Sequence, residues 1–178
     1  MTTKHADFWR FSLAVYRQDS VQQECLNLQD RYDIDVNLIL LCAFAGAAHG
    51  ALLKAKGVKE ASDAVGIWQR QIVSGLRGVR RTLKPFLSAS STLDTPVAHL
   101  RTQVKALELE AERIEQQILE RWLITQIHFL QRSRPLHAVE DNLRTLFALY
   151  VREQGPPALP QQLISMALMV AGNSRGDD

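Results

Sequence analysis

The segment from Val36 to Ala48 is apolar on every side when it is wound as an α-helix. A helix without a polar face must be covered by other elements around its whole circumference. Its longest apolar run, from Leu38 to Ala48, has 11 residues, whereas ~20 are needed to cross a bilayer. The sequence therefore predicts a helix over about 36–49 at the centre of a helical bundle, and we expect no membrane association.

The rest of the chain predicts further helices separated by short breaks. Glycine (9 residues) and proline (6 residues) are scarce and fall between the apolar stretches, so they act as boundaries. No run alternates polar and apolar residues for long enough to indicate a strand. The expected fold class is all-α, a single domain over residues 1–171 with six to seven helices, a connector loop at about 85–95 and a disordered tail at 172–178. Besides the central helix, the predicted helices cover about 6–17, the stretch from 20 onward, 62–84, 95–131, 137–153 and 163–170.

The predicted helix over 62–84 separates apolar from basic residues. At ~100° per residue, one face collects Val65, Trp68, Ile72, Leu76, Val79 and Leu83. The opposite side carries what we call the basic face: Arg70, Arg77, Arg80, Arg81 and Lys84. Residues 54–84 hold eight cations and two anions, a local charge of +6 within a chain whose net charge is +2.

Three interpretations of the basic face remain open. It is the solvated side of an amphipathic helix, or it binds the phosphates of RNA or DNA, or it pairs inside the fold with an acidic helix. The acidic candidate is the stretch 108–120, which has a local charge of −4. Within it, Glu108, Glu112 and Glu115 share a helical face and form the candidate counter-face.

Motifs that carry chemistry are missing from the sequence. It has no glycine-rich phosphate loop, no Gly-x-Ser-x-Gly elbow and no pairing of histidines with zinc-ligand spacing. We therefore expect no catalytic residues, no cofactor and no metal, and lean against an enzyme. Cys25 and Cys42 lie in apolar runs and predict buried, reduced thiols. The first residues lack the apolar core of a secretory signal, so we expect a cytoplasmic protein.

A second apolar stripe bears on the oligomeric state. It consists of Leu100, Val104, Leu107, Ala111, Ile114 and Ile118, spaced alternately by four and three residues. Such a stripe either forms a dimer seam or faces the domain's own core. A small domain needs this surface for itself, so we favour the core and a monomer.

Several short motifs follow one another along the first two thirds of the chain. They are Phe8-Trp9-x-Phe11-Ser12-Leu13, Tyr16, Val21-Gln22, Cys25-Leu26-x-Leu28-Gln29-Asp30, Asp35-Val36-Asn37-Leu38, Trp68, Leu76-Arg77-x-Val79-Arg80-Arg81-x-Leu83-Lys84 and Glu108-Leu109-Glu110-Ala111-Glu112-Arg113. Over about residues 7–118 the chain resembles a proteobacterial family of about this length that is described only as a conserved domain of unknown function. The resemblance implies a compact, cytosolic helical protein and brings no activity, cofactor or catalytic residue.

Our first hypothesis is a non-enzymatic interaction or adaptor protein that engages a protein partner through the basic face. The alternative is an RNA- or DNA-binding protein that uses the same residues. The third hypothesis is a small-molecule binder or enzyme with a pocket between the central helix and the N-terminal aromatic residues. That hypothesis requires a cavity of ~300 Å³ or more with convergent polar groups.

Overall fold

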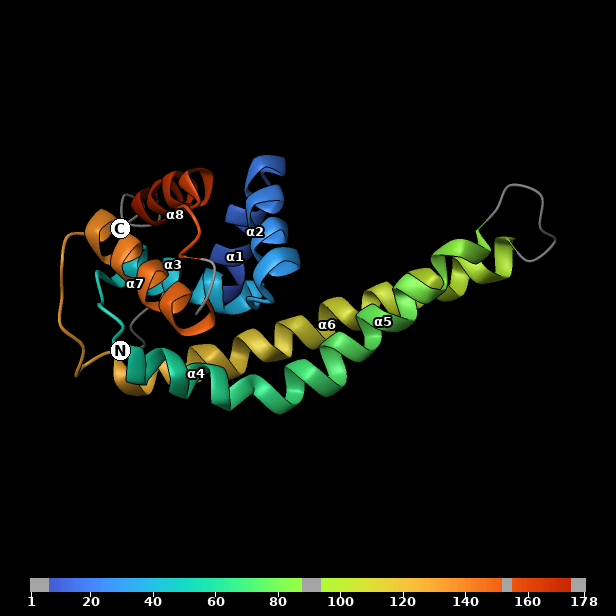
Figure 1. Cartoon of the computed structure of the whole chain (residues 1–178), viewed down its shortest axis with the longest axis horizontal. Helices are drawn as coiled ribbons and strands as arrows, with labels where there is room; N and C mark the ends of the chain where they lie inside the picture. Colours follow the sequence, from blue (N-terminus) through green and yellow to red (C-terminus); the bar gives the residue numbers. More distant parts are fainter. Residues whose placement is uncertain (1–6, 88–93, 152–154, 174–178) are drawn as a thin grey trace.

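The computed structural model describes residues 7–87, 94–151 and 155–173, and within these residues all the regular elements are helices (Figure 1). The all-α class is therefore confirmed. Because α4, η1 and α5 form one continuous rod, the described part of the chain has seven helices beside the short 3₁₀ turn η2, in agreement with the expected six to seven. In chain order the elements are α1 (Phe8–Tyr16), α2 (Asp19–Tyr32), α3 (Val36–His49), α4 (Ala55–Trp68), the π-helical turn η1 (Gln69–Val73), α5 (Ser74–Thr82), η2 (Lys84–Phe86), α6 (Asp94–Gln126), α7 (Pro135–Tyr150) and α8 (Gln161–Asn173).

The apolar helix α3 occupies the centre of the bundle, as predicted. It contacts α1, α2, α6, α7 and α8, and its residues from Asn37 to Ala47 are all buried. The side chain of Asp35 caps its first turn by accepting a hydrogen bond from the backbone N–H of Asn37 at 2.9 Å. Gly50, with φ of 61°, ends the helix in the left-handed conformation that favours glycine.

Two close contacts fix α3 against its neighbours. A Cβ at Gly46 would lie 2.5 Å from the backbone nitrogen of Val139, so glycine allows α3 and α7 to approach closely. On the other side, the ring of Phe44 stacks on Phe8 with centroids 5.2 Å apart and meets Phe11 at 5.1 Å. These contacts hold α1 and α7 on either side of the central helix.

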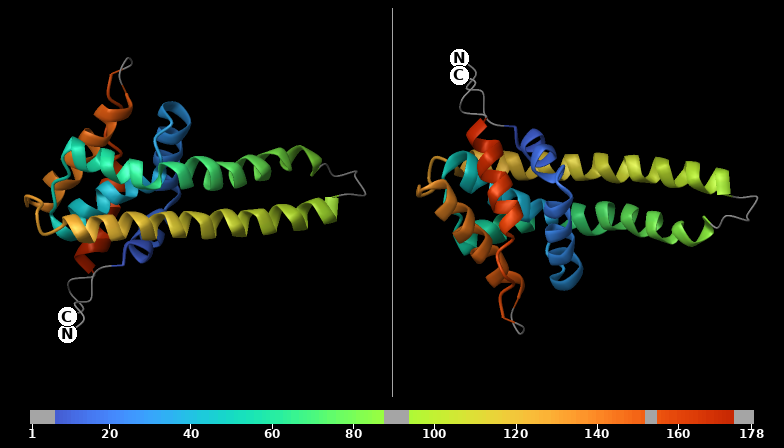
Figure 2. Two further views of the ribbon diagram at one scale, coloured as in Figure 1. Left: turned by 90° about the horizontal axis from the view of Figure 1, so that it is seen from below. Right: turned by 90° about the horizontal axis from the view of Figure 1, so that it is seen from above.

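A long two-helix arm projects from the bundle (Figures 1 and 2). We define the arm as α4–η1–α5 lying antiparallel to α6, residues 55–87 and 94–126. At 1.5 Å per residue the 33 residues of α6 span roughly 50 Å. The end near α4 packs against the bundle, and the opposite end extends beyond α2 into solvent. Midway along the arm, Trp68 Nε1 donates a hydrogen bond to the Ala111 carbonyl at 2.9 Å.

The π-helical turn corrects the prediction for the fourth helix. The helix begins at Ala55 and not near residue 62, and at Gln69–Val73 it accommodates one extra residue. A π turn rotates every side chain that follows it relative to a regular α-helix. Val73 is consequently buried, whereas Ile72 and Val79, which were expected on the apolar face, are exposed. The same rotation turns part of the basic face toward α6.

Other boundaries differ more modestly from the prediction. Helix α6 ends at Gln126 and not at 131, while α7 ends at Tyr150 and not at 153. The members of the predicted apolar stripe on α6 have different surroundings. Val104 and Ala111 are buried, whereas Leu100 and Leu107 are exposed. Of the predicted loop and tail, residues 88–93 and 174–178 lie outside the described residues, and 172–173 belong to α8.

The two cysteines are free and buried. Burial raises the pKa of each thiol to about 12, with a further contribution from Glu24 at Cys25. Both thiols are therefore protonated at neutral pH and pack as small apolar groups. Within the described residues, we find no helix that has both the length and the apolar character to span a bilayer.

Candidate functional site at the base of the arm

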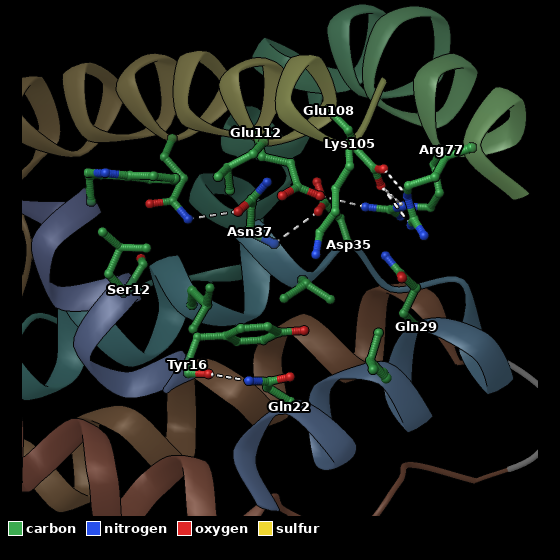
Figure 3. Close-up of a pocket in the computed structure, with 18 of the residues that line it drawn as sticks. Ser12, Tyr16, Gln22, Gln29, Asp35, Asn37, Arg77, Lys105, Glu108 and Glu112 are labelled. Atoms are coloured by element: carbon green, nitrogen blue, oxygen red, sulfur yellow. Dashed lines mark hydrogen bonds and ion pairs between the residues drawn. The ribbon is translucent and has the colours of Figure 1, made fainter. Parts of the chain in front are cut away.

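A cavity of about 400 Å³ lies where the arm passes the bundle (Figure 3). Five helices supply its walls. Helix α1 contributes Trp9, Ser12, Leu13 and Tyr16; α2 contributes Gln22, Leu26 and Gln29; Asp35, Val36, Asn37 and Leu40 come from the start of α3; Arg77, Arg80 and Arg81 from α5; and Lys105, Glu108, Leu109, Glu112 and Gln116 from α6. The volume exceeds the ~300 Å³ expected of a ligand pocket.

The wall near the bundle carries a row of buried amides. Gln116 Nε2 donates to Asn37 Oδ1 at 2.8 Å, and Asn37 Nδ2 donates to Glu115 Oε2 at 2.9 Å. The row ends in two unsatisfied atoms, because Gln116 Oε1 and the nearby cavity-lining Ser12 Oγ have no hydrogen-bond partner in the described part of the chain. Gln116 is 4% exposed and Ser12 is 3% exposed. Leaving such a buried polar atom unpaired costs about 1–3 kcal/mol.

The carboxyl group of Glu115 keeps its proton behind this wall. Glu115 is fully buried, and burial, reinforced by its hydrogen bond to Asp35, raises its pKa to about 10. Glu115 Oε1 has no hydrogen-bond partner among the described residues, which agrees with a carboxyl that stays neutral. At neutral pH the Glu115 carboxyl is therefore uncharged.

Two arginines of the basic face are tied to the acidic helix. Arg77 Nε and Nη2 donate to Glu108 at 3.0 Å and to Glu112 at 2.9 Å, and Arg80 also pairs with Glu108. Burial disfavours the charged form of Glu108, but hydrogen bonds from Arg80 and Arg77 outweigh burial and lower its pKa. For Glu112 burial prevails over the attraction of Arg77, and its pKa is raised.

The other members of the basic face have different surroundings. Arg81 lines the cavity, and its nearest carboxylate is the exposed Asp30 at 3.8 Å. Arg70 and Lys84 are exposed on the arm and do not line the cavity. Of the candidate counter-face, Glu108 and Glu112 meet arginines, whereas Glu115 points into the bundle and bonds Asn37. In both the basic face and the candidate counter-face, therefore, some residues form ion pairs between α5 and α6 and others do not.

The outer rim of the cavity is apolar. Leu13, Leu26 and Leu109 come from three different helices, line the same cavity and are 42%, 39% and 51% exposed. Tyr16 and Trp9 add aromatic surface from α1. Helix α1 is held against the arm by the Phe8 N–H, which donates to Glu120 Oε1 at 2.8 Å. An uncovered leucine rim of this kind offers contact area to an apolar ligand.

Sequence reasoning missed several cavity residues. Ser12, Gln116 and Lys105 show no local pattern that marks them, because their common surroundings arise only when α1 packs beside α6. One signal was present: most lining residues belong to the segments that carry the resemblance described above. These are Trp9, Ser12, Leu13, Tyr16, Gln22, Leu26, Gln29, Asp35, Val36, Asn37, Arg77, Arg80, Arg81, Glu108, Leu109 and Glu112.

Comparison with known families confirms the resemblance. The model of the family described as Protein of unknown function (DUF2390) matches residues 7–119. All the side chains that line the cavity fall inside the matched range. No curated protein and no solved structure gives a significant match to the chain.

Proposed function

Because the chain belongs to the family of proteins of unknown function DUF2390, we propose its function from the site itself: it binds a small organic molecule in the cavity at the base of the arm. The observation that carries this proposal is the pair of buried, unpartnered polar atoms, Ser12 Oγ and Gln116 Oε1, in the wall of a 400 Å³ cavity. Native proteins satisfy almost all their buried polar atoms, and a ligand that hydrogen-bonds these two would complete the site.

A fragment screen monitored by ¹H–¹⁵N NMR tests the proposal. We expect binding fragments to shift the amides of cavity residues, including Ser12 and Gln116. The variant Leu109→Trp should fill the cavity mouth and abolish those shifts. Leu107→Trp is the matched control, because Leu107 is exposed on the same helix and does not line the cavity. Fragments that shift other surfaces alone, or that bind Leu109→Trp as well as the wild type, would contradict the proposal.

The arm supports a second candidate function, docking to a protein partner. Val79, Phe86, Leu100 and Leu107 are exposed large apolar side chains on α5, η2 and α6, which belong to the arm. Exposed apolar surface of this kind is typical of interaction sites. Arg70, Arg81 and Lys84 remain on the surface to provide charge, whereas Arg77 and Arg80 are engaged by glutamates.

Photo-crosslinking from a residue analogue at position 86 tests this second candidate. A protein adduct that is lost on Val79→Asp would support docking to a protein. A nucleic-acid adduct, with an affinity that falls steeply as salt rises, would favour the nucleic-acid alternative. The compartment we propose is the cytoplasm, which the free Cys25 and Cys42 support, and we propose that the chain works as a monomer.

A further inference from the structure

The charges around the cavity are not balanced. Four cations line it, Arg77, Arg80, Arg81 and Lys105, against three carboxylates, Asp35, Glu108 and Glu112. The two glutamates are neutralised by Arg77 and Arg80. Asp35 accepts a hydrogen bond from the Asn37 N–H and forms no ion pair with a described cation. Arg81 and Lys105 are therefore the two lining cations that form no ion pair with another described residue of the cavity wall.

These two cations come from the two helices of the arm. Arg81 lies on α5 with Asp30 at 3.8 Å, in a pair that is mostly exposed to solvent, so this contact contributes little. Lys105 lies on α6 and has no ion-pair partner among the described residues. Figure 3 shows Lys105 extending from α6 toward the cavity, above Tyr16. A guanidinium and an ammonium at one cavity are a suitable receptor for a carboxylate or a phosphate.

The remaining surfaces of the cavity specify the rest of the ligand. The three rim leucines Leu13, Leu26 and Leu109 are uncovered and offer apolar contact. Ser12 Oγ and Gln116 Oε1, two buried atoms of lining residues, have no hydrogen-bond partner among the described residues. The cavity thus has a cationic side, an apolar rim and a small polar floor.

We propose that the ligand of this cavity is a small organic anion, a carboxylate or phosphate ester with an apolar body, whose charged group is bound by Arg81 and Lys105. This inference rests on the proposed function and adds the chemical class of the ligand. The apolar body lies against the leucine rim, so that the ligand contacts the bundle and the arm at once.

Isothermal titration calorimetry with matched eight-carbon probes tests the ligand class. The probes are octanoate, octyl phosphate and octylammonium, each below its micelle concentration, so that the head group is the main variable. We expect the two anions to bind at least about tenfold tighter than octylammonium, the difference that one charge-assisted hydrogen bond supplies. Comparing octanoate with octyl phosphate then distinguishes a carboxylate receptor from a phosphate receptor.

Charge-removing variants locate the binding group. Lys105→Gln and Arg81→Gln should each weaken anion binding by about tenfold. Lys84→Gln is the matched control, because Lys84 is an exposed lysine of the same arm that does not line the cavity, and it should leave the affinity unchanged.

The outcomes separate the two proposals. Octylammonium binding as tightly as the anions, with loss of binding in Leu109→Trp, would overturn the anionic class while the cavity stays a binding site. Anion binding that Lys84→Gln weakens as much as Lys105→Gln would also overturn the assignment. Failure of all three probes, together with failure of the fragment screen to reach the cavity, would overturn the proposed function itself.

Discussion

The buried, protonated carboxyl of Glu115 gives a stability prediction with a definite sign. The folded protein raises the pKa of Glu115 to about 10, chiefly through burial and then through Asp35, whereas an unfolded glutamate titrates near pH ~4.3. A carboxyl whose pKa is higher in the folded chain than in the unfolded chain contributes its full stability to the fold at pH values below the unfolded pKa. That stability is lost progressively as the pH rises toward the folded pKa.

Its size follows from proton linkage. Between pH 5.5 and 8.5 the unfolded chain has released this proton and the folded chain has kept it, so unfolding becomes easier by about 1.4 kcal/mol per pH unit, about 4 kcal/mol over the window. Glu112, which faces the same region and has a raised pKa, acts in the same direction. Glu115→Gln removes the proton exchange but keeps an amide that can donate to Asp35 and accept from Asn37.

Urea unfolding followed by far-UV circular dichroism at pH 5.5, 6.5, 7.5 and 8.5 measures the effect. The free energy of unfolding of the wild type, relative to Glu115→Gln, should fall by about 4 kcal/mol across this series. Glu110→Gln changes an exposed glutamate of the same helix. Its free energy of unfolding should change with pH as that of the wild type does. If Glu115→Gln also runs parallel to the wild type, the carboxyl is ionised in the fold and our account of the cavity's charge is wrong.

Four further substitutions test the contacts that hold the fold together. Gly46→Ala should destabilise by about 3 kcal/mol or more, because its Cβ would meet the backbone of α7 at 2.5 Å. Gly75→Ala, with nothing within 4 Å of the added carbon, should stabilise by about 0.5–1 kcal/mol in the same thermal and urea assays. Arg77→Met should cost about 2 kcal/mol by leaving Glu112 without its partner, and adding Glu112→Gln should recover part of that loss. Asn142→Ala should cost about 3 kcal/mol and speed amide exchange at residues 51–53, because three buried backbone groups lose their hydrogen bonds.

The apolar segment 36–48 was sufficient to predict the architecture of the bundle. A helix without a polar face has to be central, and α3 is surrounded by five others. The direction in which the side chains of the fourth helix point was not predictable, because Gln69–Val73 has the composition of an ordinary helix and no sequence pattern indicated the π turn. One extra residue turned Arg77 and Arg80 inward and left Val79 outside.

The site could be predicted only in part. Pairing of the basic face with Glu108 and Glu112 was one of three open interpretations, since periodicity places residues on a helix face but does not say which helix it meets. Ser12 and Gln116 could not be recognised as cavity residues from the sequence, because they lie more than 100 residues apart and only tertiary packing brings them together. The charge near the cavity also depends on the protonation of the buried Glu115. No sequence pattern indicates that this carboxyl keeps its proton.

The central claim is that the cavity at the base of the arm is a binding site for a small organic anion. A crystal structure of the protein soaked with octyl phosphate tests it most directly. We expect the phosphate to lie within hydrogen-bonding distance of Lys105 and Arg81, with the alkyl chain against Leu13, Leu26 and Leu109. Octyl phosphate bound elsewhere on the protein, with only water in the cavity, would contradict the account.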